Sequence, residues 1–273
     1  MKSRNSIKNL LLQIKQEQYK VPKEISAFEL ALEMMTQIGT VDAELRDKLI
    51  YSTLCKWFEN NEFTPEQMRS LLQISLSDSH LFCGIGETET DTVFTRSFSV
   101  LIVPLAVYAH KQSNYLTENE ISYMKERLIL YVELENDLRG YVTGKGWAHA
   151  IAHAADGLNS ISTLPSLNHV DLLDILHIIQ NKICIDKYLY INEEDERMVT
   201  VVKTIINREI IEEDICIEWI NSLGLINKNG KFPEDDILKG NTKCLLRSLY
   251  FRLFDQSKFN KYTDAIIKSL STL

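Results

Sequence analysis

Helix-start signals recur along the chain, and they constrain its fold more than any other feature. In three places a hydroxyl residue is followed three positions later by glutamate or glutamine, which is the capping box that satisfies the first backbone N–H groups of a helix. The three boxes are Ser26 with Glu29, Thr64 with Gln67 and Thr117 with Glu120. Asn168 is a further N-cap. These signals predict that a helix begins directly after each of them.

The spacing of apolar residues behind these signals also matches helices. Leu172, Leu176 and Ile179 are an example of recurrence at intervals of three and four positions, which is the spacing of one helix face. Strand-like alternation is scarce, and residues 182–190 are the most ambiguous stretch. Only 10 glycines and 5 prolines are present, a poor supply for the turns of an all-β protein. The sequence therefore predicts an all-α fold.

The loops between the expected helices indicate how these helices are arranged. The loops are short, which favours antiparallel neighbours and hence successive helical hairpins. Stacked hairpins form either a compact bundle or a curved superhelix, and the uneven spacing of the caps excludes a strict repeat. We expect an irregular α-α superhelix of the armadillo or HEAT type. Because no linker rich in Pro, Gly or Ser divides the chain, we expect a single domain over residues 1–273.

Charge argues against one class of partner. The net charge is −8, so the chain repels phosphate backbones on average, and we expect no nucleic acid as partner. The stretch after Gly240 is locally basic, and a solvated helical face opposite the acidic run 193–196 is the favoured interpretation. Its cations are Lys243, Arg247, Arg252, Lys258, Lys261 and Lys268.

The longest apolar run, residues 98–109, covers about half a membrane span and contains Pro104. It predicts a buried, bent helix and no membrane contact.

Cysteine usage bears on the compartment. The five cysteines are widely spaced, odd in number and form no Cys-x-x-Cys pair. Reduced thiols are therefore expected rather than disulfides or a cysteine zinc site. The only apolar run near the N-terminus, residues 10–12, is too short for a secretory signal. These features predict a cytoplasmic protein.

Two glycine-containing loops, residues 84–86 and 140–146, are each expected directly before a helix. Glycine permits close backbone approach, and a helix N-terminus attracts anions. Neither loop has the spacing of a Walker A motif or of a dinucleotide fingerprint, so tight turns are favoured over phosphate binding. The helix expected after the second loop begins at Trp147 and has two faces. Trp147, Ile151, Ala154 and Leu158 form an apolar stripe, and His149, His153 and Asp156 form a polar column on the opposite side.

The polar column permits three interpretations. Two histidines four residues apart can share a divalent metal such as zinc, with Asp156 as a third ligand or as the partner of a ligand. The same side chains can act as acid and base. Alternatively, both imidazoles hydrogen-bond to neighbouring groups and fix the helix packing. The glutamate of the zinc-protease motif His-Glu-x-x-His is missing, so the sequence leaves the three interpretations open.

The helix expected after Asp91 has a similar design. Phe94, Phe98, Leu101, Leu105 and Tyr108 make its packing stripe, and Arg96 points the other way. Because both helices carry polar groups opposite an apolar stripe, we predict one ligand-binding groove between them. Its predicted residues are Arg96, Asp137, Arg139, Trp147, His149, His153 and Asp156.

Three segments resemble a known family. They are residues 95–99 (TRSFS), residues 135–141 (ENDLRGY) and residues 146–156 (GWAHAIAHAAD), the last with the pattern Gly-Trp-x-His-x-x-x-His-x-x-Asp. These segments resemble an uncharacterised bacterial family, domain of unknown function 2785, with a family-like core of roughly residues 90–260. The resemblance implies a helical, armadillo-like fold and a cytoplasmic bacterial protein. It implies no reaction, because the family has no established activity.

Two functions fit the predicted groove. The first is a scaffold that binds a peptide, a protein segment or a small anionic ligand, since stacked helices create concave surfaces. The second is a metal-dependent hydrolase that uses His149, His153 and Asp156. No serine lies in a Gly-x-Ser-x-Gly nucleophile elbow. We favour the scaffold, because helical stacks more often bind than catalyse.

Overall fold

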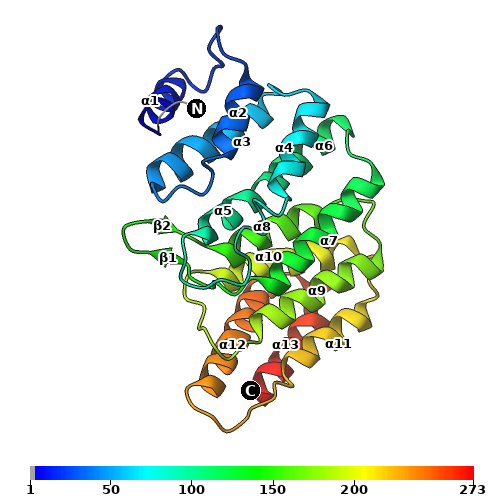
Figure 1. Cartoon of the computed structure of the whole chain (residues 1–273). Coiled ribbons are helices and arrows are strands. Elements are labelled where there is room, and N and C mark those ends of the chain that lie inside the picture. The colour runs from blue at the N-terminus through cyan, green and yellow to red at the C-terminus, as the bar shows by residue number, and fades with distance from the viewer. Residues whose placement is uncertain (1–3) are drawn as a thin grey trace. The chain divides into compact units, whose positions relative to one another are not determined.

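The computed structural model describes residues 4–273 (Figure 1). Its contacts divide the chain into two compact units, one up to Ser160 and one over Ile161–Leu273. Helices dominate both units, which confirms the predicted all-α fold. The single domain that we expect from the lack of a linker stays a prediction, and so does the superhelical arrangement.

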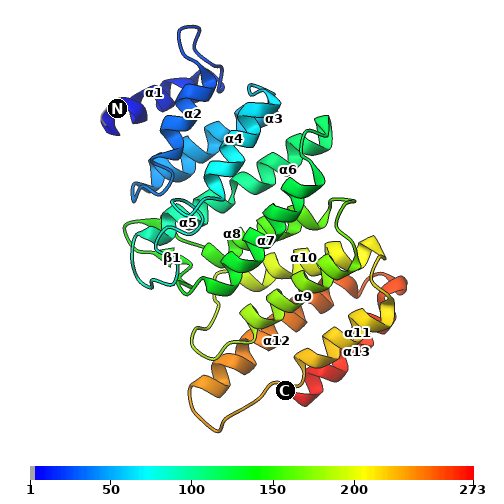
Figure 2. The ribbon, with the colours of Figure 1, turned by 45° about the vertical axis from the view of Figure 1, so that its right-hand side comes forward.

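The first unit contains helices and one small hairpin. Its helices are α1 Arg4–Gln16, α2 Ala27–Met35, α3 Ser52–Glu59, α4 Pro65–Ser75, α5 Thr92–Val100, α6 Ile102–Ser113, α7 Glu118–Leu134 and α8 Ala150–Ser162, whose last turn crosses the boundary. The π-helix η1 Glu44–Tyr51 precedes α3, and the strands β1 Tyr141–Val142 and β2 Gly146–Trp147 pair antiparallel. α4 packs against α2 and α6, and α3 packs against η1 and α6 (Figure 2).

All regular elements of the second unit are helices. It contains α9 His169–Ile183, α10 Glu194–Arg208, α11 Glu213–Leu223, α12 Glu234–Leu253, the 3₁₀ turn η2 Ser257–Phe259 and α13 Asn260–Thr272. α12 packs against α9, α10 and α13, and α11 packs against α13. The stretch 182–190, ambiguous in sequence, ends α9 and continues without regular structure.

Local capping explains where several of these helices begin. The side chains of Ser26, Thr64, Thr117 and Asn168 each accept a backbone N–H of the following first turn. At the last three the reciprocal bond is also present, which completes the capping box. All four predicted helix starts are therefore confirmed.

The apolar run around Pro104 forms a bent core helix. The helical segment Thr92–Ser113 is interrupted at Leu101, where α5 ends and α6 begins. Pro104 has no N–H for the carbonyl of Val100, so a regular helix cannot continue through this turn. The segment is long and apolar enough to cross a membrane, and 78% of its most apolar window is buried inside the protein. The residues of its predicted packing stripe are buried except Tyr108, which is 47% exposed.

The helix predicted to begin at Trp147 begins instead at Ala150, and this prediction was wrong by three residues. Residues 141–147 form a β-hairpin, in which Gly144 and Gly146 have φ of 78° and 82°. His149 follows with φ of 47°, and such left-handed residues interrupt a right-handed helix. Trp147 consequently lies on a strand and is 39% exposed, whereas we had placed it in a packing stripe.

Candidate functional site

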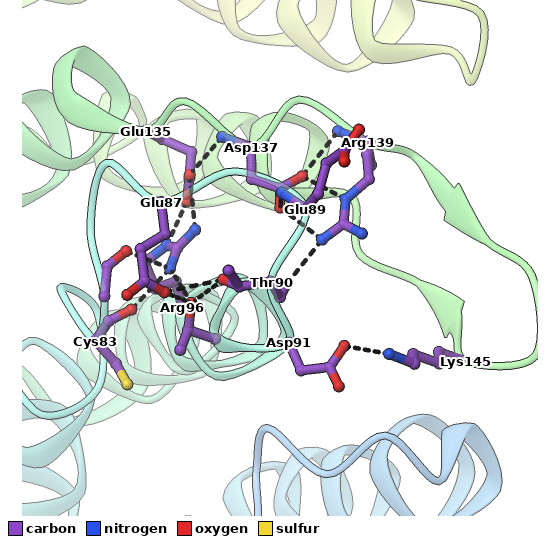
Figure 3. A network of polar contacts seen from close by, with 12 residues as sticks. Cys83, Glu87, Glu89, Thr90, Asp91, Arg96, Glu135, Asp137, Arg139 and Lys145 are labelled. Carbon is purple, nitrogen blue, oxygen red and sulfur yellow. Dashed lines mark hydrogen bonds and ion pairs between the residues drawn. The ribbon is translucent and has the colours of Figure 1, made fainter.

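The two glycine-containing loops of the sequence meet in the first unit. Residues 83–91 lie against residues 135–145, and a continuous set of polar contacts joins them (Figure 3). At one end of this network Arg96 reaches the first loop, and at the other end Lys145 of the hairpin pairs with Asp91 at 2.6 Å. The network therefore holds the hairpin against the start of α5.

Arg96 lies at the buried end of this network. Its Nε and Nη2 donate to the two carboxylate oxygens of Glu135 at 2.7 and 2.9 Å, and both side chains are fully buried. Its Nη1 donates to the carbonyls of Cys83 and Gly84 and to the Thr92 hydroxyl. Burial lowers the pKa of Arg96, but the hydrogen bonds and charge of Glu135 outweigh burial and raise it overall. Arg96 thus supports the loop from below and is covered from solvent.

Asp137 and Arg139 form the second pair of the network. Asp137 is 1% exposed, and its carboxylate accepts Nε and Nη2 of Arg139 at 2.8 and 2.6 Å. The same carboxylate accepts the backbone N–H of Glu89, and Arg139 Nη2 also donates to the Thr90 carbonyl. The hydrogen bonds to Asp137 raise the pKa of Arg139. Each pair therefore ties one glycine-containing loop to the other.

A third arginine, which is fully buried, anchors the hairpin itself. Arg46 of η1 is fully buried, and its Nη2 donates to the carbonyl of Lys145 at 2.9 Å. Its guanidinium carbon lies 4.3 and 4.7 Å from the ring centres of Phe94 and Phe98, a cation–π arrangement. Burial lowers the pKa of Arg46, against the opposing charge of Asp47. Arg46 therefore joins the π-helix, α5 and the hairpin.

A row of aromatic rings begins on the hairpin above these arginines. Tyr141 and Trp147, opposite each other across the strands, meet edge to face with ring centres 5.0 Å apart. Trp147 stacks on His149 at 4.2 Å and 27°, and His149 meets His153 edge to face at 5.8 Å. Tyr141 and Trp147 are 57% and 39% exposed, and the two histidines are half-buried. We call Tyr141, Trp147, His149 and His153 the aromatic row.

The predicted site residues fall into two neighbouring groups. Arg96, Asp137 and Arg139 belong to the network, and Trp147, His149 and His153 belong to the aromatic row. Two contacts join the groups: His149 N–H donates to the Arg139 carbonyl, and His153 Nδ1 lies 3.0 Å from the Ser97 carbonyl. Asp156 is half-buried on α8, one turn beyond His153. Because Arg96 and Asp137 are buried and paired, they support the surface from below. A ligand contact by either is not favoured.

The metal interpretation stays a prediction. The rings of His149 and His153 are adjacent, as sharing a metal would require. Among the described residues, no group of three His, Cys, Asp or Glu side chains is close enough to hold a metal ion. Metal analysis of the purified protein and of the His149→Ala variant checks this prediction.

Sequence reasoning missed three members of the site. Arg46 lies in an ordinary helical stretch and contacts residues about a hundred positions away, so no local pattern points to it. Glu135 lies in the family-like segment 135–141, but nothing in the sequence pairs it with Arg96. Tyr141 had one available signal, since it flanks a glycine-containing loop and so stands opposite Trp147 once that loop is a hairpin.

Comparison with known proteins gives one result. Residues 81–251 match a family model described as "Protein of unknown function (DUF2785)", close to the expected core of residues 90–260. No curated protein and no solved structure matches the chain.

Proposed function

The chain belongs to the DUF2785 family, since the match covers more than half of it, and we propose that it is a binding protein whose aromatic row recognises a basic peptide or protein segment. The observation that carries this proposal is the exposure of Tyr141 and Trp147 beside half-buried imidazoles. Exposed, contiguous aromatic surface on a folded protein is typical of interaction sites.

The rigidity of the hairpin supports a binding role. Arg46 holds the carbonyls of Lys145 and Trp147, and Lys145 is paired with Asp91. Trp147 is further held between two rings, Tyr141 on one side and His149 on the other. A surface held in one geometry loses little conformational entropy when a partner binds, which favours affinity.

The charges around the hairpin favour a basic partner over an anionic one. Glu87 and Glu89 lie exposed on the loop beside the hairpin, next to Asp91, whose charge is paired with Lys145. The nearest cations are neutralised, because Arg139 pairs with Asp137 and Lys145 pairs with Asp91. Arginine and lysine side chains also bind the faces of tryptophan and tyrosine. Of the ligands predicted from sequence, a peptide or protein segment therefore fits better than a small anion.

Tryptophan fluorescence tests the proposal directly. Trp57 and Trp219 are 0% and 5% exposed, so Trp147 dominates quenching by acrylamide. Arrayed short peptides rich in arginine, in glutamate or in neutral residues are the probes. We expect arginine-containing peptides to protect Trp147 from the quencher, and their affinity, measured by anisotropy of the labelled peptide, to fall about tenfold in Trp147→Ala, as for an interface hot spot.

Tyr123→Ala provides the matched control, because Tyr123 is also exposed, at 49%, but lies on α7 away from the row. This variant should bind like the unmodified protein. Equal binding of glutamate-rich peptides, or unchanged affinity in Trp147→Ala, would refute the proposal.

A further inference from the structure

The outer side of α12, in the second unit, combines positive charge with exposed aromatic rings. Three cations follow one another at intervals of four residues, and three aromatic residues continue the same side to the end of the helix. They are Lys239, Lys243, Arg247, Tyr250, Phe251 and Phe254. At about 100° per residue these positions fall within an arc of about 120°. We call this set the α12 face.

The aromatic end of the α12 face is a cluster open to solvent. Tyr250 and Phe254 stack with ring centres 5.9 Å apart and planes 14° apart, and Phe251 meets both edge to face. Phe251 is 66% exposed and Phe254 is 54% exposed. Contiguous exposed apolar surface of this kind marks interaction sites more often than chance. This end of the face is suited to bury an apolar side chain of a partner.

The basic end of the α12 face lacks acidic partners. Within residues 4–273, neither Lys239, Lys243 nor Arg247 takes part in an ion pair, whereas Arg252, which lies outside this face, pairs with Glu196. The pKa of Lys243 is lowered, first by loss of solvation and then by the charges of Lys239 and Arg247. Like charges four residues apart destabilise a helix. An anionic partner would relieve this repulsion.

The opposite side of α12 is firmly held within the second unit. Leu245 and Leu249 are completely buried, and Ser248 donates to Asp195 of α10. Asn241 Nδ2 donates to the Ile185 and Tyr188 carbonyls of the preceding segment. The cations and rings of the face are therefore displayed by a fixed helix.

We propose that the α12 face binds an acidic protein segment that carries an apolar anchor beside its carboxylates. The carboxylates pair with the three cations, and the anchor packs on the ring cluster. The face is about 22 Å long at 1.5 Å per residue, which suits a helix of a few turns. This surface is separate from the aromatic row, whose surroundings are acidic.

Two other anionic partners, lipid bilayers and nucleic acids, fit the face less well. Asp236 and Asp255 are exposed at its two ends, so a broad anionic surface would meet repulsion beyond the cations. The whole chain carries a net charge of −8, and tight binding to a phosphate backbone requires many cations. A short segment avoids both penalties because it touches only the middle of the face.

Selection from a displayed library of short random peptides tests this inference on the full chain. Peptides that also bind the triple variant Lys239→Glu, Lys243→Glu, Arg247→Glu are removed by counter-selection. We expect enrichment of sequences with several Asp or Glu on one side of a Leu or Phe. For a selected peptide, anisotropy should show at least about a tenfold loss of affinity in the triple variant and in Phe251→Ser. Replacement of the Asp and Glu residues of that peptide by lysine should restore binding to the triple variant.

Lys268→Glu, an exposed charge reversal on α13, is the matched control and should bind normally, as should Trp147→Ala. The inference is overturned if no acidic sequence is enriched. It is also overturned if phosphatidylcholine vesicles with phosphatidylglycerol, or oligo(dT), bind the face more tightly than every selected peptide. Loss of Trp147 affects only the proposed basic-segment site, so the two proposals fail independently.

Discussion

Three arginines show how single residues shape this protein, and each is stabilised differently. Arg96 meets a carboxylate with two parallel hydrogen bonds, which is the strongest arrangement available to a guanidinium. Arg139 is partly exposed and pairs with a buried aspartate. Arg46 instead relies on backbone carbonyls and two phenylalanine faces, with Asp47 at 2.8 Å. At the scale of single residues, these charged side chains join loops to helices.

Glu135→Gln tests the structural role of the buried pair. The amide keeps the shape of the side chain but leaves the charge of Arg96 uncompensated inside the protein. We expect the free energy of unfolding to fall by about 3 kcal/mol or more, as measured by urea denaturation. Glu126→Gln, an exposed site on α7, should change it by less than about 0.5 kcal/mol. Similar losses in the two variants would show that the pair contributes little.

His110 gives the protein a pH-dependent stability. Its Nδ1 accepts the backbone N–H of Leu116 at 3.0 Å, a role that only the unprotonated nitrogen can fill. Burial lowers the pKa of His110, against the opposing charge of Glu120. The folded state therefore binds fewer protons than the unfolded state, and stability should fall as the pH falls below about 6.5 towards the lower folded-state pKa.

Urea midpoints between neutral and mildly acidic pH measure this dependence. We expect the stability of His110→Gln to decline less steeply with falling pH than that of the unmodified protein. Part of the decline should remain, because burial also lowers the pKa of His80. An equal slope in His110→Gln would rule out His110 as a source.

At the scale of elements, the hairpin β1–β2 is the feature that departs most from an all-helical pattern. It interrupts the chain between α7 and α8 and displays Tyr141 and Trp147 on paired strands. It is held at its base, because Gly146 lies directly against Ala43 and Arg46. The hairpin therefore depends on η1, which lies about a hundred residues earlier in the chain.

Substitution of its two glycines by alanine separates backbone strain from packing. Both have positive φ, so each replacement should cost about 1–2 kcal/mol from strain alone. A Cβ on Gly146 would lie 2.8 Å from the Ala43 Cβ, whereas a Cβ on Gly144 would meet nothing within 4 Å. Gly146→Ala should therefore cost at least about 1 kcal/mol more in the free energy of unfolding. It should also shift Trp147 emission to the red, and equal costs for the two variants would contradict close packing at Gly146.

At the scale of the whole molecule, the two proposed binding surfaces belong to different units. The first unit carries an aromatic row beside acidic loops, and the second carries a basic face with exposed rings, although the chain as a whole is acidic. Net charge alone therefore describes neither surface. In the structure, the cations of the locally basic stretch after Gly240 fall into two groups. Arg252 and Lys261 pair with glutamates, as a solvated face does, and Lys243 and Arg247 belong to the α12 face.

The sequence alone determined the all-α class and the starts of several helices, whereas tertiary structure decided which elements meet and revealed the hairpin β1–β2. Caps such as Thr64 and Thr117 act within one helical turn, and apolar spacing reports burial over a few turns, so both could be read locally. The grouping of Arg139, His149 and His153 was partly foreseen, because these residues are close along the chain. The pairing of Arg96 with Glu135 and the contact of Arg46 with the hairpin join residues 39 and 99 positions apart. Such contacts depend on how distant helices pack, and this information is not contained in any short stretch of sequence.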